Sequence, residues 1–76
     1  MIRIKVKFFA ITKDIVGKSE SDFLLQENST ANHFLQELVN EFPKLIEWKK
    51  NLRIAVNNEY VDLNFILNEK DEVEIG

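Results

Sequence analysis

The feature that most constrains the fold is an alternation of apolar and charged residues at both ends of the chain. Near the N-terminus the apolar residues occupy every second position: Ile2, Ile4, Val6 and Phe8. A period of two is typical of a β-strand with one buried face. The segment from Glu72 to Ile75 repeats this pattern one residue before the sequence stops at Gly76. We expect this last strand to lie inside a sheet, with a neighbour on each side.

Between these strands the sequence predicts one long helix. Its apolar residues recur at spacings of three and four and would form a single stripe: Ala31, Phe34, Leu35, Leu38, Val39 and Phe42. The segment from Glu27 to Thr30 offers side-chain oxygens that can cap the first turn, although we expect no complete capping box. Pro43 restricts the residue before it to extended backbone and therefore ends the helix.

The other elements are predicted to be short. In chain order they are a helical turn at 11–17, a strand at 22–26, a turn or one loop of helix at 44–51, and a strand at 53–56 with a partner at 60–61. Gly17 is suited to ending the helical turn. Asn57 and Asn58 suit the positive φ angles of a tight turn. Residues 63–67 receive no assignment.

These elements predict an α+β fold of the β-grasp, or ubiquitin-like, type. One main helix would cover one face of a mixed sheet, and the first and last strands would pair in parallel at its centre. A ferredoxin-like fold would need a second helix of similar length, for which 44–51 is a poor candidate. A chain of 76 residues is long enough for a single domain, residues 1–76, and for no second core.

Composition argues against several classes of function. Without cysteine the sequence has no disulfide framework, thiolate metal site or thiol nucleophile. A net charge of −3 argues against nucleic acid as the main partner, because phosphate binding needs excess positive charge. We expect a cytoplasmic protein with no membrane contact, because no targeting segment or long apolar run is present. We predict no catalytic residue, no metal and no cofactor, and place the only histidine, His33, on the helix surface.

Phe9 is the strongest candidate for a binding residue, because it falls on the polar face of the first strand. Either the strand ends at Phe8 and Phe9 turns inward, or Phe9 is an exposed aromatic anchor for a partner. Arg3, Lys5 and Lys7 form a basic stripe on that face, which is a solvated strand surface or a contact for an acidic protein. Four carboxylates between residues 69 and 74 are solvated charge or a patch for a basic partner.

Several short motifs resemble the MoaD family, the small subunit of molybdopterin synthase and a relative of the thiazole sulfur carrier ThiS. In chain order they are Phe8-Phe9-Ala10, Val16-Gly17, Glu41-Phe42-Pro43, Ala55-Val56-Asn57 and Asp71-Glu72-Val73. The resemblance covers nearly the whole chain and implies a β-grasp sulfur carrier that is not catalytic alone. It also implies two partners, a MoaE-like large subunit and an E1-like (MoeB-like) adenylating enzyme.

The resemblance further implies where the sulfur is carried. In the family a C-terminal Gly-Gly is adenylated and converted to a thiocarboxylate, and the tail enters the active site of the large subunit, in molybdenum cofactor biosynthesis. The partner interface is predicted to contain Phe9, Lys7 and Ile75. No Gly-Gly tail follows Ile75 here. We expect the native chain to continue past Gly76, and Gly76 would carry the thiocarboxylate only if the native chain ends there.

Two alternatives stand beside a sulfur carrier for molybdopterin synthase. The same domain could carry sulfur in another pathway, for a thiazole or a tungsten cofactor. It could also be a ubiquitin-like binding module without covalent chemistry. Co-purification with a MoaE-like protein would favour the first function. A native C-terminus at Gly76, with no mass change from an E1-like enzyme, would favour the binding module.

Overall fold

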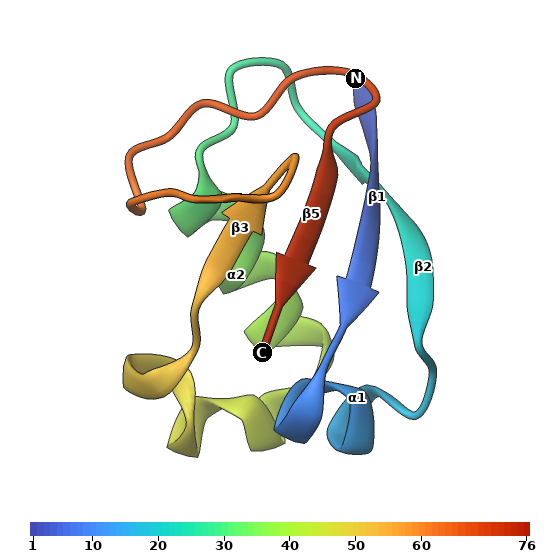
Figure 1. Ribbon diagram of the computed structural model, residues 1–76, viewed down its shortest axis with the longest axis vertical. Helices are drawn as coiled ribbons and strands as arrows, with labels where there is room; N and C mark the ends of the chain where they lie inside the picture. Colours follow the sequence, from blue (N-terminus) through green and yellow to red (C-terminus); the bar gives the residue numbers. More distant parts are fainter.

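The computed structural model describes residues 1–76 and contains one five-stranded mixed sheet with the strand order β2-β1-β5-β3-β4 (Figure 1). In chain order the elements are β1 (Ile2–Phe8), α1 (Ala10–Val16), β2 (Glu20–Leu25), α2 (Ala31–Glu41), two 3-10 helices (Pro43–Glu47 and Lys49–Asn51), β3 (Ile54–Val56), β4 (Glu59–Tyr60) and β5 (Glu72–Ile75). β1 and β5 run parallel at the centre, and all other neighbouring strands are antiparallel. The predicted β-grasp fold, with its first and last strands paired at the centre of the sheet, is confirmed.

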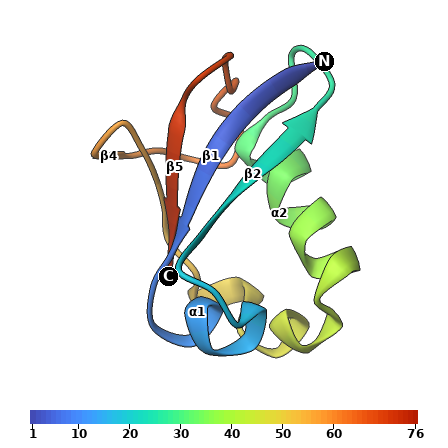
Figure 2. The same cartoon turned by 90° about the vertical axis from the view of Figure 1, so that its right-hand side faces the viewer.

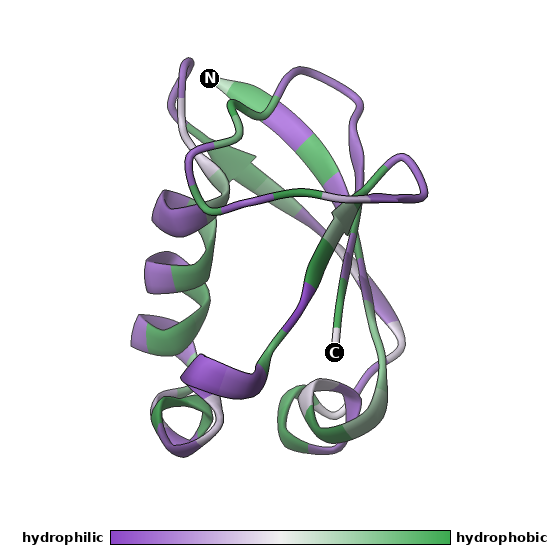
Figure 3. Cartoon of the chain, turned by 60° about the vertical axis from the view of Figure 1, so that its left-hand side comes forward, coloured by the Kyte–Doolittle hydropathy of each residue, from purple (hydrophilic) through white to green (hydrophobic).

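The core lies between α2 and one face of the sheet (Figure 2). The predicted apolar stripe faces the strands, and the hydrophilic side of α2 faces away (Figure 3). Fifteen buried apolar residues form one cluster, to which α2 contributes Ala31, Phe34, Leu35 and Leu38. At the side of this cluster, the partly buried Phe23 ring meets the rings of Phe8 and Phe34 edge-on, with centroids 6.4 and 5.5 Å away. This geometry is favoured over face-to-face stacking by the ring quadrupoles.

The N-terminus of α2 corrects one prediction from the sequence. Thr30 Oγ1 accepts a hydrogen bond from the backbone N–H of His33 (3.2 Å), and the backbone N–H of Thr30 donates to His33 Nδ1 (3.1 Å). This is a complete capping box, although we predicted none, because His33 takes the place that glutamate or glutamine usually holds. The imidazole is otherwise exposed, as predicted.

Most of the short elements agree with the sequence, with shifted boundaries. The predicted helical turn is the seven-residue α1, and Gly17 ends it at a φ of 85°. Asn57 and Asn58 have φ angles of 51° and 71° and connect β3 to β4, as predicted. The region around residues 44–51 forms two short 3-10 helices. Residues 63–67 form no helix or full strand, but Ile66 makes a single antiparallel bridge to Thr30.

The basic stripe of β1 lies between two acidic strands on the face of the sheet away from α2. Lys5 pairs with Asp22 of β2 on one side and with Glu72 of β5 on the other. Lys7 Nζ also lies 3.4 Å from Glu72 Oε1. Opposite charges on neighbouring strands favour the observed strand order, whereas direct pairing of β2 with β5 would place carboxylates together. The stripe therefore lies among acidic neighbours, with one ion pair, which fits its interpretation as a solvated strand surface.

Candidate partner-binding surface

Phe9 lies where β1 and β5 end side by side. β1 ends at Phe8, but the backbone stays extended for one more residue, with φ −126° and ψ 156°. The Phe9 N–H donates to the carbonyl oxygen of Ile75 (2.9 Å). The Phe9 side chain is 48% exposed, so the interpretation in which it turns inward is wrong. Phe9 is therefore an exposed aromatic residue at this end of the sheet, and its role in binding a partner stays a prediction.

A buried hydroxyl holds the turn that follows Phe9. Thr12 Oγ1 lies 2.7 Å from the carbonyl oxygens of both Phe9 and Ile75, and it accepts a hydrogen bond from the Phe9 N–H at 3.2 Å. Thr12 is fully buried. Between these residues Ala10 has a φ of 51°, in the left-handed region, which costs a non-glycine residue about 1–2 kcal/mol. Thr12 thus connects the start of α1 to the end of β5 and positions Phe9.

Replacing Thr12 with valine is expected to lower the free energy of unfolding by about 1–2 kcal/mol. Valine has the same shape but leaves the buried carbonyl groups of Phe9 and Ile75 without the hydroxyl donor. The loss is limited because both carbonyls also accept backbone hydrogen bonds. Urea denaturation measures the change. The matched control is Thr12→Ser, which keeps the hydroxyl. Equal stability of the valine variant and the native protein would contradict this role.

Beside Phe9 the surface is hollowed. We call this site the Phe9 hollow; it has a volume of about 320 Å³ and is lined by Phe9, Ala10, Arg53, Ala55, Tyr60, Glu74, Ile75 and Gly76. Tyr60 is 76% exposed, and the Arg53 guanidinium carbon lies 5.9 Å from the centre of its ring. A cation over an aromatic face is attracted by the ring quadrupole. The hollow therefore combines two aromatic rings with one cation and one carboxylate, a composition typical of partner interfaces.

Gly76 closes the hollow on the side of β5. Its N–H donates to the carbonyl oxygen of Arg53 (3.2 Å), and its carbonyl oxygen accepts from the Arg53 N–H (2.9 Å). A Cβ atom added at Gly76 would lie 3.0 Å from Phe9 Cβ and 3.2 Å from the Phe9 carbonyl oxygen. Glycine at this position is thus explained by the close approach of two backbones. These two hydrogen bonds continue the pairing of β5 for one residue beyond Ile75.

Two of the three predicted interface residues, Phe9 and Ile75, line the Phe9 hollow, and Lys7 does not. Ile75 is only 1% exposed and packs in the core, because β5 pairs it with Phe8 and turns both toward α2. Ile75 still lines the Phe9 hollow, so any contact with a partner there would be made by its main chain, and its place in an interface stays a prediction. Lys7 lies on the same sheet face as Phe9 but beside Glu72, outside the lining of the hollow. Its place in an interface stays a prediction.

Sequence reasoning missed Thr12, Arg53 and Tyr60. Arg53 was included only as the start of a predicted strand, and Tyr60 only as its partner. The one local signal for Thr12 is its position three residues after Phe9, where a hydroxyl can bond to the first turn of a helix. Nothing in the sequence places Arg53 or Tyr60 beside Phe9, because that contact depends on the order of strands in the sheet.

Few other features of the molecule suggest a site for chemistry. No three histidine, cysteine, aspartate or glutamate side chains are grouped so that they could hold a metal ion. Every buried side-chain nitrogen and oxygen has a hydrogen-bond partner. No helix combines the length and the apolar character that crossing a membrane requires. The Phe9 hollow, at the end of β1 and β5, is therefore the strongest candidate for a partner-binding site.

Comparisons with known proteins agree with one another. A family model described as the ThiS family matches residues 6–75. The chain is 32% identical, over 74 residues, to the molybdopterin synthase sulfur carrier subunit of Arabidopsis thaliana, covering 97% of this chain and 77% of that protein. A structure from Pyrococcus furiosus is named as molybdopterin converting factor subunit 1. It matches this chain with a TM-score of 0.89 at 25% identity, and the match covers 99% of this chain and 95% of that protein. The fold also matches a chain in the complex of subunits 1 and 2 of the molybdopterin-converting factor from Helicobacter pylori 26695. The TM-score is 0.68 at 21% identity, and the match covers 97% of this chain and 90% of that one.

Proposed function

Because this chain belongs to the ThiS family, we propose that it is the sulfur carrier subunit of a molybdopterin synthase and works in molybdenum cofactor biosynthesis. The resemblance found in its motifs is confirmed at the level of the family. Support for molybdopterin synthase, over a thiazole or tungsten pathway, comes from the Arabidopsis relative, whose name carries this function at 32% identity. The chain alone is not catalytic under this proposal, and the chemistry takes place on its partners.

The partner we propose for the Phe9 hollow is the large subunit of the synthase. One observation carries this assignment: an aromatic side chain, 48% exposed, is held at the end of the central strands by a buried hydroxyl and a strained turn. Conformational strain and an exposed aromatic together are typical of functional surfaces. The Helicobacter pylori fold relative, solved as a complex of subunits 1 and 2, supports a partner of this kind.

A second partner, an E1-like adenylating enzyme, follows from the chemistry of a carboxyl group. Sulfide does not displace oxide from a carboxylate, so the carboxylate must first attack ATP, releasing pyrophosphate and giving an acyl adenylate. Sulfide then displaces AMP from the adenylate and leaves the thiocarboxylate. In this structure the main chain of Gly76 is bonded to Arg53 in the sheet. A carboxyl group on Gly76 would therefore have to leave the sheet before it could enter an active site.

The mass of the intact protein tests this proposal. The full native gene is expressed together with its E1-like enzyme and a sulfur source, and the mass is compared with that of protein made without the enzyme. We expect a chain ending in glycine that is heavier by the difference between one sulfur and one oxygen atom. A chain that keeps an unmodified carboxylate under both conditions would contradict the carrier function and favour the binding module.

A further inference from the structure

β2 is an edge strand, and its outer edge is free. The Phe8 N–H donates to the carbonyl oxygen of Ser19 (2.8 Å), which fixes the alternation of hydrogen-bonded pairs between β1 and β2. In this register the N–H and C=O groups of Glu20, Asp22 and Leu24 point away from β1. Only one of these groups has a hydrogen-bond partner: the Asp22 carbonyl oxygen, which accepts from Ser21 Oγ at 3.4 Å. This edge can therefore accept another strand.

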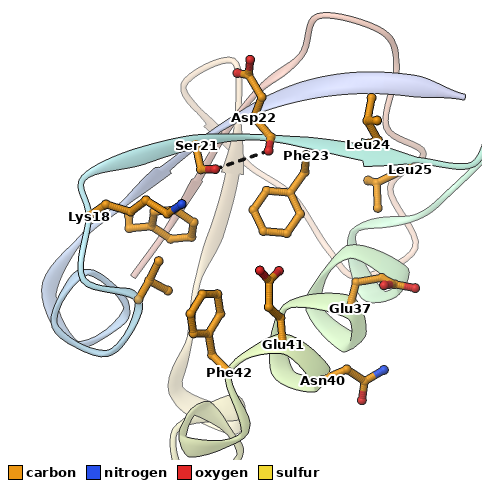
Figure 4. Close-up of a pocket in the computed structure, with 12 residues that line it drawn as sticks. Lys18, Ser21, Asp22, Phe23, Leu24, Leu25, Glu37, Asn40, Glu41 and Phe42 are labelled. Carbon is orange, nitrogen blue, oxygen red and sulfur yellow. Dashed lines mark hydrogen bonds between the residues drawn. The ribbon is translucent and has the colours of Figure 1, made fainter.

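A groove runs along this edge between β2 and the second half of α2. We call it the β2 groove; its volume is about 540 Å³. Val16, Phe23 and Phe42 line it, and each is only partly buried, so apolar surface is left open to solvent. In Figure 4 the Phe23 ring projects toward α2, and the Glu41 carboxylate projects toward β2 from the opposite side. The groove is thus apolar at its base and acidic at its rim.

The charges at the rim are unbalanced. Asp22, Glu37 and Glu41 are exposed, whereas Lys18 is the only cation that lines the groove. The Glu41 carboxylate faces the groove, and the Asp22 carboxylate points away from α2, onto the outer face of the sheet (Figure 4). None of these three carboxylates takes part in an ion pair, since the one ion pair of the chain joins Lys7 to Glu72. A basic partner would therefore gain opposite charges here without displacing existing ones, and a nucleic acid would be repelled.

The pairing rules of the sheet define which strand fits. β1 already pairs with the other edge of β2, and it places Lys5 opposite Asp22 and Lys7 opposite Glu20. An added strand would meet the same carboxylates from the free side, so basic residues suit its outer face. Its alternate residues would turn into the groove, over Phe23, where apolar side chains suit. A second copy of β2 does not fit, because antiparallel pairing of the two strands would bring their carboxylates together.

We propose that the free edge of β2 and the β2 groove bind an extended segment of another protein in which apolar and basic residues alternate. The segment adds a sixth strand to the sheet. Main-chain hydrogen bonds supply affinity, and Glu20 and Asp22 on the outer face of β2 supply specificity for basic residues. This surface lies at the opposite edge of the sheet from β3 and β4, which line the Phe9 hollow. The chain can therefore hold such a segment while the Phe9 hollow is occupied, which adds a second interaction to the proposed function.

The probe is a capped, fluorescein-labelled peptide of about seven residues, the length of one strand, with alternating valine and lysine. Its binding to the whole chain is measured by fluorescence anisotropy and mapped by NMR shifts of backbone amides. We expect the shifts to gather on β2 and the second half of α2. A peptide of the same length with alternating valine and glutamate is expected to bind at least about 10-fold more weakly.

Leu24 offers a matched pair of variants. Leu24→Pro removes an N–H that points away from β1 and blocks an added strand, which a proline on an edge strand can do without breaking the sheet. Leu24→Ala keeps that N–H. We expect the proline variant to weaken peptide binding at least about 10-fold and the alanine variant less than about 3-fold. If the proline variant does not fold, Asp22→Lys replaces it, with the same loss expected from charge reversal.

The variant Phe9→Arg distinguishes this proposal from the proposed function. It changes the Phe9 hollow, the proposed site for the large subunit, and should leave the affinity of the β2 edge for the peptide unchanged. Three results would overturn the proposal. They are equal affinity for both peptides, amide shifts centred on the Phe9 hollow, and sedimentation showing that copies of the chain occupy the edge themselves. Absence of peptide binding at millimolar concentration would overturn it as well.

Discussion

Replacing Leu38 with alanine is expected to lower the free energy of unfolding by about 2–5 kcal/mol. Leu38 is fully buried in the middle of the apolar face of α2, where it packs against the sheet. Truncation removes apolar contacts and leaves a cavity that the surrounding core fills only in part. For a chain of 76 residues, whose total stability is on the order of 5 kcal/mol, this change approaches global unfolding.

Urea denaturation followed by circular dichroism measures the effect on Leu38. The matched control is Gln36→Ala, an exposed position on the same helix, where a change within about 0.5 kcal/mol is expected. The two substitutions create the same side chain on opposite sides of α2, so they differ mainly in burial. A loss below about 1 kcal/mol at Leu38 would show that the stripe does not hold the core.

The second large effect is expected at Phe9. Replacing Phe9 with arginine should weaken binding to the large subunit at least roughly 30-fold, the loss typical of an interface hot spot. The aromatic ring is lost from the Phe9 hollow, and a second cation is brought next to Arg53. Stability should change by less than about 1 kcal/mol, because half-exposed side chains carry little of the core energy. Isothermal titration against the large subunit and urea denaturation give the two quantities.

Phe65→Arg is the control for Phe9. Phe65 is also partly exposed, at 37%, but it lies in the loop that contacts the N-terminus of α2 rather than at the end of β1 and β5. Its replacement should leave affinity for the large subunit within about 3-fold of the native value. If Phe9→Arg unfolds the protein, or if both variants lose binding equally, the assignment of Phe9 as an anchor is wrong.

The major elements were predictable because their signals are local. The alternation in β1 and β5 and the three- and four-residue spacing in α2 each identify an element and its buried face. The Asn57-Asn58 turn was predictable because asparagine tolerates positive φ. The capping box of α2 was missed because His33 Nδ1 accepts the hydrogen bond from the Thr30 N–H, which a glutamate or glutamine side chain usually accepts.

The candidate site was predictable only in part. Alternation placed Phe9 on the outer face of β1, and the structure keeps it there. The same alternation places the Ile75 side chain on the inner face with Val73, so the side chain is buried although the residue lines the Phe9 hollow. Thr12 could not be found from its neighbours, because one of its bonds reaches Ile75 at the far end of the chain.

Side-chain periodicity and turn chemistry act over a few residues, so they were enough to predict the two alternating strands, the amphipathic helix and the β-grasp class. Which residues meet where the strands end became visible only in the three-dimensional fold. The contact of Phe9 with Gly76 and the neighbouring Arg53 depends on the strand order β1-β5-β3. The free edge of β2 depends on that order too. Such contacts are set by the register of segments far apart in the chain, and no local pattern encodes that register.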